Sequence, residues 1–503
     1  MTASDVRDLL LAKRLDISRV GEILAPFGLT DFEKADANLQ AAAGDPGERL
    51  MLAEILADLL VSVSSSANPD QSLNFFERFV QAIGNRSNLF TYLRNSRQAL
   101  EILARSTGGS AYMAEILIRD PHHFYWVTDP QILQRTRSKE ELQKELRQTL
   151  QMLKNEDKQL AYLRAFKRKE MLHIGVRDLL RIASVEATLE SLSVLAETLI
   201  SATYEISDAA LRRTHQVPAK LFTDFTILAM GKLGGGELNF SSDVDLMFLY
   251  ASNDPKAARI SAQDYFRRLA QRIASGLSAY TGEGYVYRVD LRLRPEGDAG
   301  NLADPIDGYE RYYRTRMGAW ERLALLKAWP VAGDLSLGKR FLEMARPFIF
   351  AAEFDLGEVR SMKAQMDEKI SARGQSDRNV KLGTGGIREI ELVVQSLQAA
   401  HGGKHPALLD RNTLRALSKL RERALIGENE YDALNRAYLF LRDVENKLQM
   451  ADDAQTHSLP AEIEGVRTCA RLLGYDSETP FLQDYRQYTK QVSGVFEKFV
   501  GRG

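Results

Sequence analysis

The sequence has few of the features that assign a compartment or a partner on their own. Cys469 is its single cysteine, so no disulfide can form within the chain, which favours a reducing compartment. The 67 basic and 68 acidic residues leave a net charge of −1. No overall field therefore attracts nucleic acid or an anionic membrane, and any chemistry on phosphates must depend on a local cluster.

Long apolar runs are also missing. The first residues, MTASDVRDLL, carry acids rather than a basic stretch followed by an apolar one, so we expect no secretion signal. No window reaches the roughly 18 uninterrupted apolar residues of a membrane span. The expectation is a cytoplasmic protein with no membrane or nucleic-acid partner. At 503 residues the chain exceeds what one hydrophobic core usually serves, which predicts several domains.

The pattern of apolar residues divides the chain into three regions. In Leu142–Tyr162 and Glu186–Tyr204 apolar residues return at steps of three and four, as in amphipathic helices. The predicted organisation is a helical region over 1–220, an α/β core over 221–303 and a helical bundle over 304–503. The expected fold class is mixed and mainly α.

The α/β core contains three expected strands. They are Phe225–Met230, Val244–Tyr250 and Tyr285–Arg294, with a helix over Ala262–Tyr280 before the last. Asp304 and Pro305 then read as the N-cap and first-turn proline of a new helix.

The stretch GKLGGGELNFSSDVD, over 231–245, lies between the first two strands. Glycines let backbone N–H groups approach an anion closely, as in phosphate cradles. Asp243 and Asp245 are two residues apart at the start of a strand, so their carboxylates share a face. Two acids on one face repel unless a cation lies between them, and Mg²⁺ prefers oxygen ligands. Either feature alone is weak evidence, but the combination with flanking strands is much rarer by chance.

A third acid lies in YVYRVDLRLR, over 285–294. Asp290 shares a face of the expected strand with Arg288, Arg292 and Arg294. Such a face can be a salt-bridged solvent surface. Beside two carboxylates, Asp290 becomes a candidate third metal ligand, and the arginines become candidates for binding phosphoryl oxygens.

These residues resemble the nucleotidyltransferase superfamily. Its phosphate-loop pattern matches the sequence at Gly231, Gly236, Ser242, Asp243 and Asp245, with Lys232 in place of a serine. The resemblance implies that Asp243, Asp245 and Asp290 hold Mg²⁺, two ions in the usual case, and are catalytic. It also implies that the nucleotide and phosphate are bound by seven residues. These are Gly231, Lys232, Gly236, Ser242, Arg288, Arg292 and Arg294.

Within that superfamily the chain resembles the glutamine synthetase adenylyltransferases. The resemblance covers roughly 150–450 and rests on GKLGGGELNFSSDVDLMFLY, FKRKEMLHIGVRDLL, YRVDLRLRPEGDAG, WERLALLKA, KLGTGGIREIELVVQ and YLFLRDVENKLQ. Such enzymes normally contain two similar halves, and this chain has one copy of each motif. GGGELNFSSD and KLGTGGIREIE resemble the amino half, which removes AMP from a glutamine synthetase tyrosine by phosphorolysis, with phosphate consumed and ADP released.

The resemblance leaves other interpretations open. The first alternative is ATP-dependent adenylylation of glutamine synthetase, and the second is a regulatory module without catalysis, disfavoured by the three retained acids. The last alternative is an enzyme that transfers a nucleotide to another acceptor. The family also implies glutamine synthetase and the signalling protein PII as partners. Lys381 with Gly383–Gly386 is either an anion site at a helix N-terminus or a tight turn between helices. Arg388 and Glu391 are spaced for an i,i+3 ion pair, and the histidines show no metal-ligand spacing.

Overall fold

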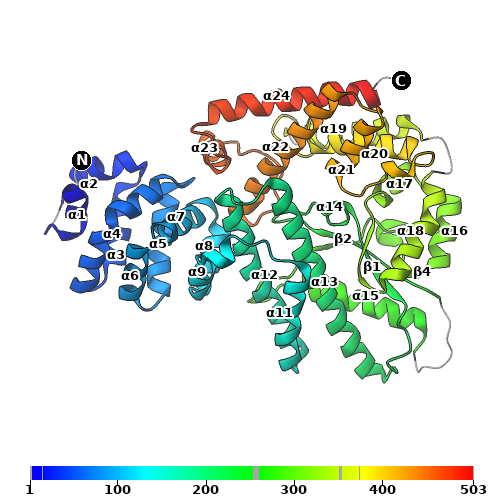
Figure 1. Ribbon diagram of the computed structural model, residues 1–503, viewed down its shortest axis with the longest axis horizontal. Helices are drawn as coiled ribbons and strands as arrows, with labels where there is room; N and C mark the ends of the chain where they lie inside the picture. The colour runs from blue at the N-terminus through cyan, green and yellow to red at the C-terminus, as the bar shows by residue number, and fades with distance from the viewer. Residues whose placement is uncertain (1–2, 14, 253–259, 351–353, 373, 502–503) are drawn as a thin grey trace. The chain divides into compact units, whose positions relative to one another are not determined.

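The computed structural model describes residues 3–501 apart from 14, 253–259, 351–353 and 373. The chain is mainly helical with one small sheet, which confirms the predicted fold class (Figure 1). It divides into two compact units, each assembled from separate stretches of sequence. Unit 1 comprises Met1–Thr136, Arg168–Thr188 and Asn446–Gln483, and unit 2 comprises Arg137–Lys167, Leu189–Glu445 and Asp484–Gly503.

The helices of the first 215 residues alternate with short capped turns. They are α1 (Ala3–Leu11), α2 (Ile17–Leu24), α3 (Phe32–Ala43), α4 (Pro46–Ser64), α5 (Pro69–Ala82), α6 (Arg86–Asn95), α7 (Arg97–Gly109), α8 (Ala111–Arg119), α9 (His122–Val127), α10 (Pro130–Leu133), α11 (Lys139–Met152), α12 (Glu156–Leu179) and α13 (Val185–His215). Asp45 and Glu48 form a reciprocal capping box at the start of α4, which satisfies amide groups that a helix leaves unpaired. The helix expected over Leu142–Tyr162 is divided between α11 and α12, whereas Glu186–Tyr204 lies within α13 as predicted.

Among the described residues, five strands form the sheet of unit 2. They are β1 (Phe225–Ala229), β2 (Val244–Tyr250), β3 (Val289–Asp290), β4 (Ala303–Pro305) and β5 (Trp329–Gly333). The order is β3-β2-β1-β5, with β4 also paired to β2. Strand β1 is antiparallel to β2 and β5, whereas β3 and β4 run parallel to β2. The predicted strands at 225–230 and 244–250 are therefore confirmed.

Two predicted elements near the sheet were wrong in extent. Only Val289 and Asp290 of the expected strand 285–294 pair in the sheet. The Asp290 side chain accepts a hydrogen bond of 2.8 Å from the Arg292 backbone N–H, which turns the chain away from β2. Asp304 and Pro305 are strand residues of β4 rather than a helix start, and the next helix begins at Ile306.

The remaining helices follow or interrupt the strands. They are α14 (Gly231–Gly235), α15 (Ala262–Ser278), α16 (Ile306–Arg316), α17 (Ala319–Leu325), α18 (Leu335–Ile349), α19 (Leu356–Ser371), α20 (Ile387–His401), α21 (Thr413–Glu422), α22 (Glu428–Asp452), α23 (Ile463–Leu472) and α24 (Glu478–Phe496). Helix α18 packs on β1 and β5, and α16 packs on α18 (Figure 1). Their apolar residues bury Leu228, Met247 and Leu249 of the sheet, which fixes the sheet against these helices. Among the described residues, no helix combines the length and apolar character needed to cross a membrane.

Candidate active site

The glycine-rich segment forms a single helical turn, α14, between β1 and β2. The backbone N–H of Met230, just before it, donates to the backbone carbonyl of Asp245 at 2.9 Å. Gly231 has a φ of +54°, and a Cβ atom there would lie 2.5 Å from Oδ2 of Asp245. Glycine is required because any side chain would enter the space of that carboxylate in addition to straining the backbone.

Strand pairing brings two of the three predicted carboxylates together. Asp245 of β2 and Asp290 of β3 are direct partners in the parallel register. Adjacent strands lie about 4.8 Å apart, so side chains at paired positions on one face are neighbours. Asp243 lies just before β2, and the N–H of Val244 donates to the carbonyl of Arg288 at 2.9 Å. Residues 243–245 and 288–290 are therefore aligned, although more than 40 residues separate them in the chain.

The carboxylate of Asp245 lies where burial and negative charge both favour its protonated form. Burial raises its pKa to about 6, and the negative charges of Asp290 and Asp243 act in the same direction. The ammonium groups of Lys381 and Lys232 oppose this change. Among the described residues, the Asp245 side chain has no hydrogen bond or ion pair. A buried carboxylate surrounded by like charge is costly in its ionised form, and a cation would relieve that cost.

Arginines bind the other two carboxylates. Nε of Arg288 lies 2.6 Å from Oδ1 of Asp243. Nε of Arg292 lies 3.0 Å from each carboxylate oxygen of Asp290, and this contact lowers the pKa of Asp290. Accordingly, in the part of the chain that the structure describes, no three acid, histidine or cysteine side chains are grouped as metal ligands.

The residue types nevertheless suit a divalent metal ion. Mg²⁺ prefers carboxylate oxygens as ligands, and Asp245 and Asp290 occupy paired backbone positions. Burial is the main cause of the raised pKa of Asp245, and the negative charges of Asp290 and Asp243 add to it. Binding a metal through all three acids would require Arg288 and Arg292 to release their partners.

Lys232 and Ser242 both lie beside these acids but already have partners. Nζ of Lys232 is 2.7 Å from Oε1 of Glu445, a fully buried residue of α22. Burial lowers the pKa of the Lys232 ammonium to about 7, although Glu445 acts in the opposite direction. The Ser242 hydroxyl accepts the backbone N–H of Asn239 at 3.3 Å. Lys232 therefore joins the glycine-rich turn to a helix some 200 residues further along the chain.

Arg294 and Gly236 shape loops. The buried Arg294 guanidinium donates to the Leu291 carbonyl at 2.6 Å and to the Gly300 carbonyl at 3.3 Å, which folds the segment between them. Gly236 ends α14 with a φ of +71°, in the left-handed region. Of the three predicted phosphate-binding arginines, Arg288 and Arg292 contact the predicted metal ligands and Arg294 contacts backbone carbonyls.

A buried charged cluster around Lys327 was not predicted from the sequence. Nζ of Lys327 lies 2.8 Å from Glu237, 3.0 Å from Glu391 and 3.0 Å from the Thr413 hydroxyl. These residues come from four segments: the loop after α14, the loop before β5, α20 and α21. Charged residues within the apolar stretch WERLALLKA were the available signal, because a charge in an apolar run is either exposed or paired.

The segment 379–386 is a turn between helices. The first N–H groups of α20, those of Ile387 and Arg388, donate to the Val380 and Lys381 carbonyls at 2.9 Å each. They are thus not available to an anion. Within α20, Arg388 and Glu391 form the predicted i,i+3 ion pair at 3.2 Å.

This sheet, with two acids paired across parallel strands beside a glycine-rich turn and helices around it, is that of a nucleotidyltransferase-like domain. Residues 100–344 match the family model described as glutamate-ammonia ligase adenylyltransferase. Residues 360–500 match the model described as GlnD PII-uridylyltransferase. Over most of its length the chain is similar to the glutamine synthetase adenylyltransferase family.

Curated relatives named bifunctional glutamine synthetase adenylyltransferase/adenylyl-removing enzyme match most of the chain. The Nitrosococcus oceani protein is 36% identical over 84% of this chain and 44% of its own length. The Thioalkalivibrio sulfidiphilus protein is 37% identical over 79% of this chain and 42% of its own length. A Xanthomonas campestris protein is 39% identical over 68% of this chain and 37% of its own length. The chain therefore spans less than half the length of these relatives.

Proposed function

We propose that this chain removes AMP from adenylylated glutamine synthetase by phosphorolysis. The observation that carries the proposal is the pairing of Asp245 with Asp290 beside Gly231, with Asp243 next to them. Such an arrangement suits phosphoryl transfer, in which positioning and charge stabilisation supply most of the rate. The names of the relatives supply the substrate, glutamine synthetase.

The direction of the reaction rests on the wording of the motifs. GGGELNFSSD, over 234–243, and KLGTGGIREIE, over 381–391, resemble the deadenylylating half of the family. In the reaction, an oxygen of inorganic phosphate forms a bond to the α-phosphorus of the tyrosyl-AMP diester. The bond from phosphorus to the tyrosine oxygen breaks, that oxygen takes a proton, and ADP is released.

The chain's own residues would bind and orient the reactants. Asp243, Asp245 and Asp290 would hold Mg²⁺, which supplies positive charge to the phosphoryl oxygens when bound. Gly231 gives the reacting phosphate close access to the backbone. The Lys381 and Lys232 ammonium groups add positive charge near Asp245. Arg288 and Arg292, once released from their carboxylates, would bind the free phosphate.

The first alternative is the reverse chemistry, adenylylation from ATP with release of pyrophosphate. The relatives carry both activities in their names, and both would use the same acids. The second alternative is a non-catalytic regulatory module. Under every alternative, the match of 360–500 to a PII-uridylyltransferase model favours PII as a regulatory partner.

One incubation separates the two directions. The chain is mixed with adenylylated glutamine synthetase, Mg²⁺ and phosphate, and ADP is measured with and without the phosphate. Phosphate-dependent ADP release supports the proposal. Transfer of label from α-labelled ATP to unmodified synthetase, with pyrophosphate release and no ADP release, would identify the reverse enzyme instead.

Asparagine variants test the site itself. Asp243→Asn and Asp290→Asn are each expected to lower turnover by at least about 100-fold while leaving the fold intact, because the electrostatic contribution is lost. Asp307→Asn, at an exposed position in the first turn of α16, is the matched control and should keep full turnover. Full activity in both site variants would exclude the proposed metal ligands.

A further inference from the structure

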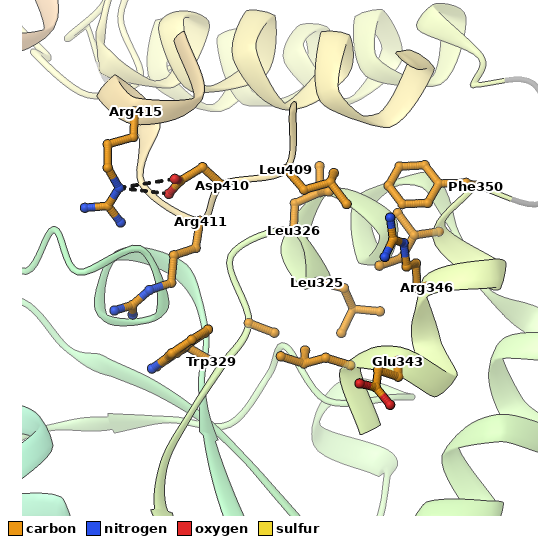
Figure 2. A pocket seen from close by; sticks show the side chains of 13 residues that line it. Leu325, Leu326, Trp329, Glu343, Arg346, Phe350, Leu409, Asp410, Arg411 and Arg415 are labelled. Carbon is orange, nitrogen blue, oxygen red and sulfur yellow. Dashed lines mark hydrogen bonds and ion pairs between the residues drawn. The ribbon is translucent and has the colours of Figure 1, made fainter. Parts of the chain in front are cut away.

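A pocket of about 430 Å³ lies in unit 2 between α18, β5 and the segment before α21. Its walls come from thirteen residues: Leu325, Leu326, Ala328, Trp329, Leu342, Glu343, Arg346, Ile349, Phe350, Leu409, Asp410, Arg411 and Arg415 (Figure 2). None of these was assigned to the proposed transfer reaction. The volume is in the range of pockets that enclose small organic ligands.

Most of the wall is apolar, and one aromatic ring contributes to it. Leucine and isoleucine side chains from α17 and α18 line the space, together with Leu326, Phe350 and Leu409. The Trp329 indole is 37% exposed, and the Arg411 guanidinium lies over it at 4.4 Å from the ring centroid. An uncovered apolar lining of this kind favours a ligand with a hydrophobic body.

Positive charge prevails around the rim. Three arginines face two acids, and one of those acids, Asp410, is already bound by Arg415 at 3.1 Å and Lys419 at 3.0 Å. Arg346 has no hydrogen-bond or ion-pair partner among the described residues. Figure 2 shows Arg346 and Arg411 at opposite sides of the pocket, with Glu343 turned away from Arg346. A guanidinium beside apolar walls recognises the anionic group of an amphipathic molecule.

We propose that this pocket binds a small organic anion, with its apolar body between α18 and Leu409 and its charged group on Arg346. The volume of the pocket favours a small molecule over a peptide. Nη1 of Arg411 also donates to the Gly234 carbonyl of α14 at 2.7 Å. The wall of the pocket is thus bonded directly to the glycine-rich turn that carries Gly231.

The test compares two fluorescent probes that differ mainly in charge. 8-Anilinonaphthalene-1-sulfonate carries a sulfonate, and N-phenyl-1-naphthylamine has the same aromatic body without it. Each is titrated into the whole chain, without glutamine synthetase, so that binding is measured independently of transferase activity. The sulfonate probe is expected to bind about tenfold more tightly, because a charge-assisted contact contributes that much.

Substitutions in α18 test whether Arg346 contacts the sulfonate. Arg346→Leu should remove the tenfold preference for the sulfonate, and Arg346→Lys should restore most of it. Arg340→Leu, at an exposed position on the same helix but outside the lining, is the matched control and should bind both probes as the unmodified chain does. Thermal unfolding of each variant confirms that the fold is retained.

Trp329→Phe locates the probe. Energy transfer from tryptophan to the bound sulfonate should fall in this variant, because Trp329 lines the pocket. An unchanged preference in Arg346→Leu, or displacement of the sulfonate probe by ADP in competition, would place the probe elsewhere and overturn the proposal.

Discussion

The Asp245 carboxylate is partly buried beside two other acids, so its ionisation opposes folding. Its pKa is raised to about 6 in the folded protein, against 3.8 as the ordinary value. The folded state therefore binds this proton more tightly than the unfolded chain does. The stability that this provides is complete below about pH 4 and is lost as the pH rises through 6.

Asp245→Asn should accordingly separate stability from activity. At pH 7 and without Mg²⁺, the variant is expected to unfold at a higher denaturant concentration. Its free energy of unfolding should exceed that of the unmodified chain by up to about 3 kcal/mol, from the shift in pKa. At pH 4 the gain should disappear, while turnover is lost at both pH values. Chemical denaturation at the two pH values measures this, and equal stability of both proteins at pH 7 contradicts the electrostatic account.

Gly231→Ala tests the closeness of the turn to the same carboxylate. The new Cβ would lie 2.5 Å from Oδ2 of Asp245 at a φ of +54°, so the backbone or the acid must move. We expect a loss of about 1–2 kcal/mol of stability and about 100-fold in turnover. Gly84→Ala is the matched control, because Gly84 has a φ of +75° with nothing within 4 Å of a Cβ. It should lose similar stability and keep full turnover.

At the scale of elements, local pattern was sufficient for some predictions and insufficient for others. Strands β1 and β2 follow from short-range signals and are confirmed. Strand β3 is shorter than its alternation suggested because Asp290 caps the Arg292 N–H. The pairing of Lys232 with Glu445 spans 213 residues, and no local pattern encodes a contact of that range. The roles of the predicted site residues stay predictions.

The cluster around Lys327 holds four segments together, and its removal should be costly. Glu391 and Glu237 are both buried, and Lys327 with Arg388 lowers the pKa of Glu391. Lys327→Met would leave the Glu237 carboxylate without the Lys327 ammonium, whereas Glu391 would keep its ion pair with Arg388. We expect a loss of about 3–5 kcal/mol, measured by denaturant unfolding, because an unpaired buried charge is strongly destabilising.

Lys339→Met supplies the comparison for that variant. Lys339 is exposed on α18 and has no ion pair among the described residues, so its replacement should change stability by less than about 0.5 kcal/mol. If both variants unfold alike, the buried cluster does not stabilise the segments around α14.

At the scale of the whole molecule, the units and the sequence regions divide the chain differently. The boundary predicted at residue 220 stays a prediction, and the contacts of unit 2 indicate how to test it. Residues before 220 bond directly to the α/β core: the Ser193 hydroxyl accepts the Leu238 N–H at 2.9 Å, and Asp208 accepts the Tyr265 hydroxyl at 2.7 Å. The Lys167 ammonium also lies over the Tyr287 ring at 4.6 Å.

Two fragments distinguish an autonomous core from one that needs α11–α13. Fragment 137–503 keeps every stretch of unit 2, whereas fragment 221–503 lacks the stretch 137–167 and the first part, 189–220, of the next one. We expect the longer fragment to retain near-ultraviolet circular dichroism and protection from limited proteolysis. The shorter one should lose both, because α15 packs its apolar side against residues it no longer has: Gly276 faces Thr203 and Leu160. If fragment 221–503 instead resists proteolysis and unfolds cooperatively, the core folds alone. Helices α11–α13 then pack against a sheet that forms without them.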